Sequence, residues 1–224
     1  MFIGHFAVAL AAKRATPKTS LGTLLLAAQL PDLLWPIFLL IGLEHAAISP
    51  GATAVTPLDF LDYPISHSLL ADAGWGLVLA GIYVLVRTNI SGACWLWALV
   101  VSHWVLDAIS HRPDMPLWPG SPTMIGLGLW NSTAATLAVE VVMFGIAVGL
   151  YTAGTRPRDK IGTVALGCFV AFLALLYLGN VFGPPPPSIK PVAIAGLGIW
   201  LLVAWGYWID RHRTCVTPTP SGVQ

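Results

Sequence analysis

The segment 102–111 carries three potential metal ligands at regular spacing. His103, Asp107 and His111 follow one another at intervals of four residues, which puts their side chains on one stripe of an α-helix. The stripe ends the apolar run 90–109, which is long enough to cross a membrane. An ionisable group costs roughly 2.5–3.5 kcal/mol at the centre of a membrane helix, so a bound cation is the simplest compensation for such a stripe.

The composition of the chain is that of a membrane protein. Of its 224 residues, 56% are hydrophobic and only 9% are charged, whereas a soluble domain carries about 25% charged residues. The mean hydropathy is +0.77, and we predict an all-α, polytopic helical membrane protein. The net charge of +1 offers no basic surface to nucleic acid, which we exclude as a partner.

Long apolar segments define the predicted spans. They are 20–43, 69–86, 90–109, 127–153, 161–182 and 191–209, and they predict about six transmembrane helices. The apolar stretch 2–12 is too short to span, because a span needs about 20 residues, and we expect a short N-terminal re-entrant or interfacial helix there. Basic residues gather in alternate connections, so the positive-inside rule puts those connections and the C-terminus in the cytoplasm.

The chain divides into three parts on this reasoning. Residues 1–153 form a membrane-embedded domain with the metal site, and residues 154–213 contribute two additional transmembrane helices. The polar stretch 214–224 is predicted to be a disordered cytoplasmic tail.

Four further side chains of metal-binding types lie in or beside the apolar segments. Asp32 stands between two prolines that break the first segment, and Glu140 lies within the fourth. His67 begins the second segment, with the preceding serine as the predicted N-cap, and His5 lies in the short N-terminal helix. Lys and Arg lie almost entirely in loops, so within the spans only a metal cation or protons can neutralise the carboxylates.

These residues predict a divalent metal site. The predicted ligands are His5, Asp32, His67, His103, Asp107, His111 and Glu140. A set of His, Asp and Glu without Cys suits zinc first, with manganese or ferrous iron as alternatives. The candidates exceed one tetrahedral shell, which makes two neighbouring ions natural. In the alternative interpretation, each of these side chains is a hydrogen-bond partner between helices.

A metal-activated water and a carboxylate base would suit hydrolysis. Metal coordination lowers the pKa of water to about 7, and paired ions favour phosphoester chemistry. Asp107 and Glu140 are the predicted catalytic carboxylates, one of them as general base. Four further aspartates are assigned to loops, caps or the surface, and two further histidines to loops: Asp59, Asp62, Asp72 and Asp114, and His45 and His212.

The same residues carry a resemblance to a known family. Gly4-His5, Pro31-Asp32, Ser66-His67-Ser68, the segment 103–111 and Glu140 resemble, in this order, the motifs of the YdjM-like family of LexA-regulated bacterial membrane proteins. The resemblance covers roughly residues 1–150. It implies a metal-dependent hydrolase in the bacterial inner membrane.

That family is in turn distantly similar to zinc-dependent phospholipase C. His103 and Asp107 match the His-x-x-x-Asp pair of those enzymes, and Glu140 matches the second member of their His-x-x-x-Glu pair. Residue 136 is threonine where that pair has histidine. The resemblance therefore implies one or two ions rather than three.

The sequence leaves three functions open. The first is a metal-dependent hydrolase that acts on a membrane lipid or another phosphoester at the outer face. The second is a metal-ion or proton transporter, because intramembrane Asp, Glu and His are typical of transport paths. The third is a non-catalytic scaffold in which a structural metal with a closed ligand shell ties the helices together.

Overall fold

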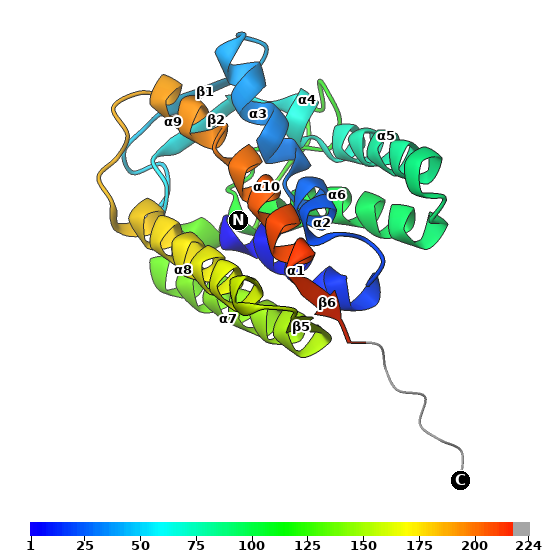
Figure 1. Ribbon diagram of the computed structural model, residues 1–224. Helices are drawn as coiled ribbons and strands as arrows, with labels where there is room; N and C mark the ends of the chain where they lie inside the picture. Colours follow the sequence, from blue (N-terminus) through cyan, green and yellow to red (C-terminus); the bar gives the residue numbers. More distant parts are fainter. Residues whose placement is uncertain (217–224) are drawn as a thin grey trace.

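The computed structural model describes residues 1–216, which fold mostly into a bundle of helices (Figure 1). Within these residues, five helical segments are long and apolar enough to cross a membrane, and a bent pair of shorter helices gives a sixth. The five are α5 (Leu69–Arg87), α6 (Ile90–Ser110), α7 (Thr133–Gly154), α8 (Lys160–Phe182) and α9 (Ile189–Gly196) taken together with α10 (Ile199–Arg211). The predicted fold class is confirmed.

The first predicted span is broken in its middle. α2 (Leu21–Ala28) and α3 (Leu30–Leu40) meet at Gln29 with a bend of 54°. Pro31 falls in the first turn of α3, where the missing N–H has no helical partner to lose. The break leaves the carbonyl end of α2 and the amino end of α3 inside the bundle, where α2 packs against α6.

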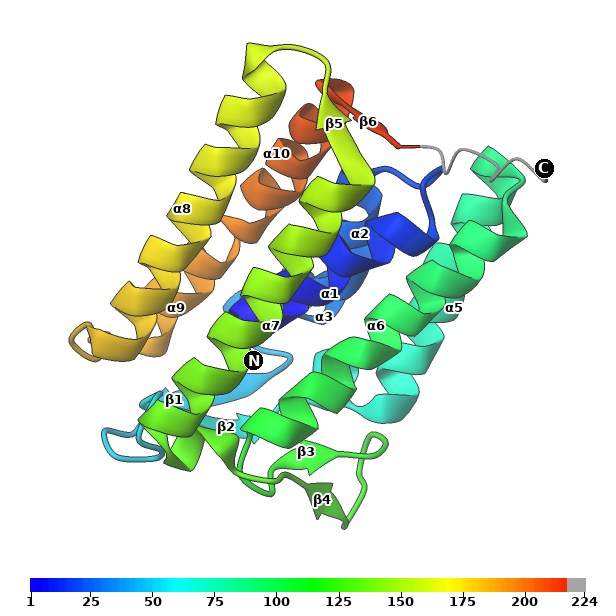
Figure 2. The ribbon, with the colours of Figure 1, turned by 90° about the horizontal axis from the view of Figure 1, so that it is seen from below.

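The short N-terminal helix α1 (Ile3–Ala15) lies in the centre of the bundle. It packs against α2, α6 and α7, and Figure 2 shows it in dark blue between α7 and α6. Phe6, Ala9 and Leu10 are fully buried. Its 13 residues rise only about 20 Å, so α1 enters the bundle without crossing it. The predicted short N-terminal helix is present, and it lies inside the bundle.

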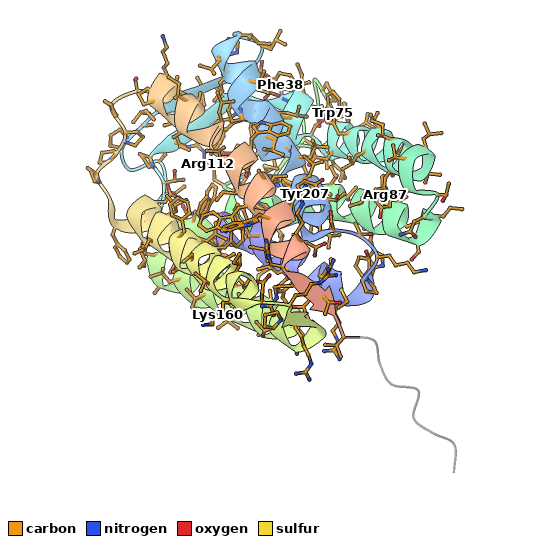
Figure 3. All side chains as sticks on the ribbon, in the orientation of Figure 1. Phe38, Trp75, Arg87, Arg112, Lys160 and Tyr207 are labelled. Atoms are coloured by element: carbon orange, nitrogen blue, oxygen red, sulfur yellow. The ribbon has the colours of Figure 1, made fainter. Side chains whose placement is uncertain are left out.

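The two ends of the bundle differ in the number of basic residues that they carry. One end holds the two-stranded sheet of β5 (Thr155–Pro157) and β6 (Arg213–Cys215), together with most of the basic residues. Those residues are Lys13, Arg14, Lys18, Arg87, Arg156, Arg158, Lys160, Arg211 and Arg213. Figure 3 labels Arg87 at the end of α5 and Lys160 at the start of α8. We refer to this end as the basic end, and its cytoplasmic orientation stays a prediction.

The opposite end consists of short hairpins and loops. β1 (His45–Ile48) pairs with β2 (Leu58–Asp62), and β3 (Met115–Pro116) pairs with β4 (Met124–Ile125), both antiparallel. The four-residue helix α4 (Pro64–His67) and the 3-10 turn η1 (Leu129–Asn131) complete this hairpin end.

Strand β6 corrects the predicted start of the tail. It includes Thr214 and Cys215, which the sequence analysis assigned to a disordered segment. The rest of that predicted tail, residues 217–224, lies outside the described residues.

The last helices complete the bundle around the broken span. α10 packs against α2 and α8, and α9 packs against α3. At the contact of α2 with α10, a Cβ on Gly22 would overlap the ring of Tyr207 (labelled in Figure 3), whose hydroxyl lies 2.9 Å from that of Thr23. Glycine is therefore required for this close approach. The division into a metal-site domain and two additional helices remains a prediction.

Removal of the Phe6 ring tests the central position of α1. Phe6→Ala is expected to lower the free energy of unfolding by about 3–5 kcal/mol, because it leaves a cavity where the side chain is fully buried. Denaturant unfolding of the detergent-purified protein measures the change. Leu85→Ala, at a side chain 85% exposed on α5, is the control and should stay within about 0.5 kcal/mol of the wild type. Equal losses in both variants would contradict the central position.

Candidate metal centre

Four predicted ligands from three helices meet inside the bundle. They are Asp32 in the first turn of α3, His67 at the end of α4, and His103 and Asp107 one turn apart on α6. We call this set the central cluster. The three members other than Asp32 are buried, whereas the Asp32 side chain is 26% exposed. Asp32 therefore forms the open side of the cluster.

Two groups of three potential ligand atoms, which share His103, are each compact enough to hold an ion. His103 Nε2 lies 3.3 Å from Asp107 Oδ2 and 3.8 Å from Asp32 Oδ1. His67 Nε2 lies 3.5 Å from Asp32 Oδ1 and 3.9 Å from Asp107 Oδ2. Tetrahedral metal–ligand bonds of about 2.0–2.2 Å put ligand atoms about 3.3–3.6 Å apart. The two groups are Asp32 with His67 and His103, and His5 with His103 and Asp107, and the shorter of these distances are those of a zinc-type site.

A backbone carbonyl at the helix break fixes the tautomer of His103. His103 Nδ1 lies 2.8 Å from the carbonyl oxygen of Ala28, the last residue of α2. A carbonyl only accepts, so Nδ1 carries the proton. In the neutral ring, Nε2 is then the unprotonated nitrogen and carries a free lone pair. This buried atom has no hydrogen-bond partner among residues 1–216. It points at two carboxylates, an arrangement that requires a cation or a proton between them.

His67 is oriented by a relay from the β1–β2 region. Ser66 Oγ donates to Glu44 Oε2 at 2.6 Å and lies 2.7 Å from His67 Nδ1. Because the single hydroxyl proton goes to the carboxylate, His67 Nδ1 is the donor to Ser66 and Nε2 faces the central cluster. The predicted N-cap role of Ser66 is wrong, since Ser68 caps α5 by accepting from Ala71 N.

Glu44 is a supporting residue that the sequence analysis missed. Its side chain is buried at 1% exposure, and its carboxylate also accepts the N–H groups of Ile65 and Ser66, both at 2.8 Å. The residue lies in a connection rich in Gly and Pro, far from His67 in sequence, and only the packing of this connection against α4 brings them together.

His111 lies at the rim and has its own carboxylate partner. Its Nδ1 lies 3.0 Å from Asp114 Oδ1, which also accepts from the Tyr63 hydroxyl at 3.0 Å. Its Nε2 lies 4.0 Å from Asp107 Oδ2. Burial and the neighbouring Asp114 raise the pKa of Tyr63 well above its ordinary value, so the phenol stays a donor. Asp114, assigned to a loop or the surface from the sequence, in fact orients His111.

His5 approaches Asp107 from the other side. Its Nε2 lies 3.0 Å from Asp107 Oδ1, and its ring stacks on that of His103 with centroids 3.7 Å apart. The amino group of Met1 contacts the same carboxylate oxygen. Asp107 Oδ2 therefore faces His67, His103 and His111, whereas its Oδ1 faces His5. The carboxylate thus lies between His5 on one side and the other histidines on the other.

Glu140 holds the amino end of α1. Its Oε2 accepts the N–H groups of Phe2 at 2.9 Å and Gly4 at 3.2 Å, which satisfies free donors of the helix terminus. Its Oε1 is buried and has no partner among the described residues. One oxygen is thus structural and the other is free for chemistry.

Two more buried polar side chains lie in or near this region without partners. Asp72 in the first turn of α5 is fully buried, and neither carboxylate oxygen has a hydrogen-bond partner among residues 1–216. The same holds for both amide atoms of Gln29 at the helix break. The assignment of Asp72 to a loop, cap or surface was therefore wrong. Its place in the first helical turn made a cap the obvious interpretation, and only the tertiary packing buries it.

The cluster forms one wall of a cavity of about 620 Å³. Asp32, His67, Asp107, His111 and Glu140 line it at the polar side. His103 and His5 are not part of its lining, because they lie behind Asp107 at 0% and 1% exposure. The seven predicted ligands thus gather around one site, with four in the central cluster and three, His5, His111 and Glu140, on its flanks.

A comparison with family models decides what this chain is related to. The model of the YdjM inner membrane protein family matches residues 1–184. The chain belongs to this family. It is a multi-pass protein of the inner membrane. The match extends past the predicted limit near residue 150 and takes in the whole of α8. No curated protein and no solved structure matches the chain.

Elemental analysis of detergent-purified protein tests the centre directly. We expect one or two equivalents of zinc, manganese or iron per chain, and loss of metal in His103→Ala and Asp107→Ala, because both variants remove atoms of the central cluster. His45→Ala is the matched control, since the His45 side chain is 60% exposed on β1. Absence of stoichiometric metal after incubation with zinc and with manganese would contradict the assignment.

The relay to His67 makes a separate prediction. Ser66→Ala is expected to weaken metal affinity about 10–100-fold, because the histidine loses the partner that fixes its tautomer. Competition with a chelator measures the change. Ser102→Ala serves as control, since the Ser102 hydroxyl bonds only the carbonyl of Leu99 within α6. Equal affinities in wild type and Ser66→Ala would show that the relay does not support the site.

Proposed function

We propose that this protein is an integral-membrane, metal-dependent hydrolase of phosphoesters. Its site lies at the hairpin end, and we assign this end to the outer face of the inner membrane because the opposite end carries the basic connections. Zinc is the preferred ion for a set of His and Asp ligands, with manganese or iron as alternatives.

One observation supports a bound metal ion in this proposal. His67, His103 and His111 each commit Nδ1 to a fixed acceptor, and their Nε2 atoms converge within 3.3–4.0 Å of Asp107 Oδ2. Lone pairs and a carboxylate packed together out of water repel one another unless a cation compensates them. A proton can serve only one such pair at a time, whereas a divalent ion serves several atoms at once.

The surrounding residues suit hydrolysis. A divalent ion bound here would lower the pKa of a coordinated water to about 7 and stabilise phosphoryl oxygens. Glu140 Oε1, buried and unpaired beside the same cavity, is the general base that accepts the proton of the attacking water. Its other oxygen is held by two backbone N–H groups, so the base is fixed in position.

The packing favours this function over the two alternatives. Between the central cluster and the basic end lie fully buried apolar side chains of α1, α2 and α6, among them Leu10, Leu24 and Leu96. They offer no polar path for an ion, which argues against transport. The partial exposure of Asp32 to a cavity of about 620 Å³ argues against a closed structural site.

Hydrolysis of a panel of phosphoesters by the metal-loaded protein tests the proposal. The panel holds bis(p-nitrophenyl) phosphate, p-nitrophenyl phosphate and phosphatidylglycerol in mixed micelles. We expect activity that chelation removes, and a fall of about 10²–10⁴-fold in kcat for Glu140→Gln, the size of a general-base contribution.

Glu140→Gln separates the base from the structural role, because the amide oxygen still accepts the N–H groups that hold α1. The variant is therefore expected to retain its metal and its unfolding transition. Asp72→Asn, at a carboxylate that does not line the cavity, is the control. A metal-loaded wild type without activity on any phosphoester would reject the hydrolase in favour of the scaffold.

A further inference from the structure

The cavity beside the central cluster is polar only on one side. Away from the cluster it continues as a groove between α8 and the pair α9–α10, lined by Phe172, Leu175 and Leu176 on one side and by Val192, Ala195 and Ile199 on the other. Figure 1 shows the N-terminus between α8 and α10, where Met1 and Phe2 join the groove to the metal centre. We call this apolar part the α8–α9 groove.

The groove runs from the hairpin end to mid-membrane depth. Phe172 and Ile199 lie near the middle of the segments 160–182 and 189–211, and Asn180 lines the cavity near the hairpin end of α8. The eight helical steps from Phe172 to Asn180 rise about 12 Å, close to half of the roughly 30 Å hydrocarbon core. The depth of the groove is therefore that of one leaflet.

Aromatic contacts close the deep end of the groove. The ring of Phe172 lies 5.9 Å from that of Trp205 on α10, and Phe169 lies 5.6 Å from the same ring. Towards the bilayer the lining side chains are uncovered, with Leu175 exposed by 69% and Phe172 by 42%. The groove is thus closed below and open sideways, on a surface that faces lipid in a spanning helix.

We propose that the substrate is a lipid phosphoester, and that one of its acyl chains lies in the α8–α9 groove while its phosphate reaches Asp32. This inference rests on the proposed hydrolase and names its substrate class. A cavity with a cluster of His and Asp at one side and hydrocarbon side chains at the other matches an amphipathic molecule. A water-soluble phosphoester would leave the apolar half unmatched.

Lateral entry explains how such a substrate arrives. Withdrawal of an acyl chain into water costs free energy for every methylene group, whereas a chain that slides from the bilayer into the groove stays in apolar surroundings throughout. Lipid tails and leucine side chains are equally apolar, so the groove aligns the chain rather than attracting it. Affinity then comes from the phosphate end, and the groove selects substrates that carry a long chain.

Gly179 allows the groove to be blocked without contact to the metal centre. It lines the cavity on α8, and a Cβ placed there meets no atom within 4 Å. Gly179→Phe therefore fits the fold and puts its ring in the path of the chain. Gly167→Phe is the matched control, because Gly167 is exposed on the same helix with equally free space and is not part of the lining.

Photo-crosslinking in vesicles tests the groove without any need for catalysis. The probe is phosphatidylglycerol with a diazirine on one acyl chain, reconstituted with wild type, Gly179→Phe and Gly167→Phe. We expect labelling per residue at 172–176 about tenfold above that at the exposed face of α5. Gly179→Phe should remove this excess, and Gly167→Phe should retain it. Leu176→Trp replaces Gly179→Phe if that variant does not accumulate.

The outcomes separate this inference from the proposed function. Equal labelling of α8 and α5, or an excess that neither groove variant lowers, overturns the groove whatever the hydrolysis assay gives. A selective excess that blocking removes supports it. If phosphoester hydrolysis is absent while the selective labelling of α8 persists, the proposed hydrolase function is rejected and the groove is still assigned to a lipid chain. If Gly179→Phe lowers hydrolysis of the long-chain lipid but not of bis(p-nitrophenyl) phosphate, both the hydrolase function and the acyl-chain groove are supported.

Discussion

The rest of this structure depends on the convergence of imidazole lone pairs on the carboxylate of Asp107. Three Nε2 atoms lie within 3.3–4.0 Å of one buried oxygen, at the wall of the cavity. In the proposed metal centre, a bound cation would attract all of these atoms and so compensate their mutual repulsion. The elements around the site follow from the need to hold these rings in place.

The helix break and the loops at the hairpin end supply the hydrogen-bond acceptors that orient the histidine rings. The helix break at Gln29 frees the Ala28 carbonyl for His103, and the connection before β1 brings Glu44 to the relay that ends at His67. The loop after α6 turns Asp114 back onto His111. Outer partners of this kind fix the tautomer and direction of metal-binding histidines. The broken span and the loops at the hairpin end are thus parts of the centre rather than connectors.

The bundle combines a tightly packed half and an open half. Towards the basic end, buried apolar side chains of α1, α2 and α6 fill the interior next to the centre. Towards the hairpin end, α8 and α9 leave an apolar groove that meets the polar cluster. This one-sided form is the basis of the proposed reaction on a lipid held in one leaflet.

The sequence by itself determined the membrane class, the apolar helices and the candidate ligands. Apolar runs of sufficient length and a four-residue spacing on a helix are local properties, so His103 and Asp107 were visible without a fold. The supporting partners were not, because Glu44, Ala28 and Asp72 act through contacts that no spacing encodes. Ser66 looked like a cap until the hairpin end placed a carboxylate beside it. Only tertiary packing decided that α1 is buried and that α8 and α9 stand apart, since burial depends on which helix faces meet.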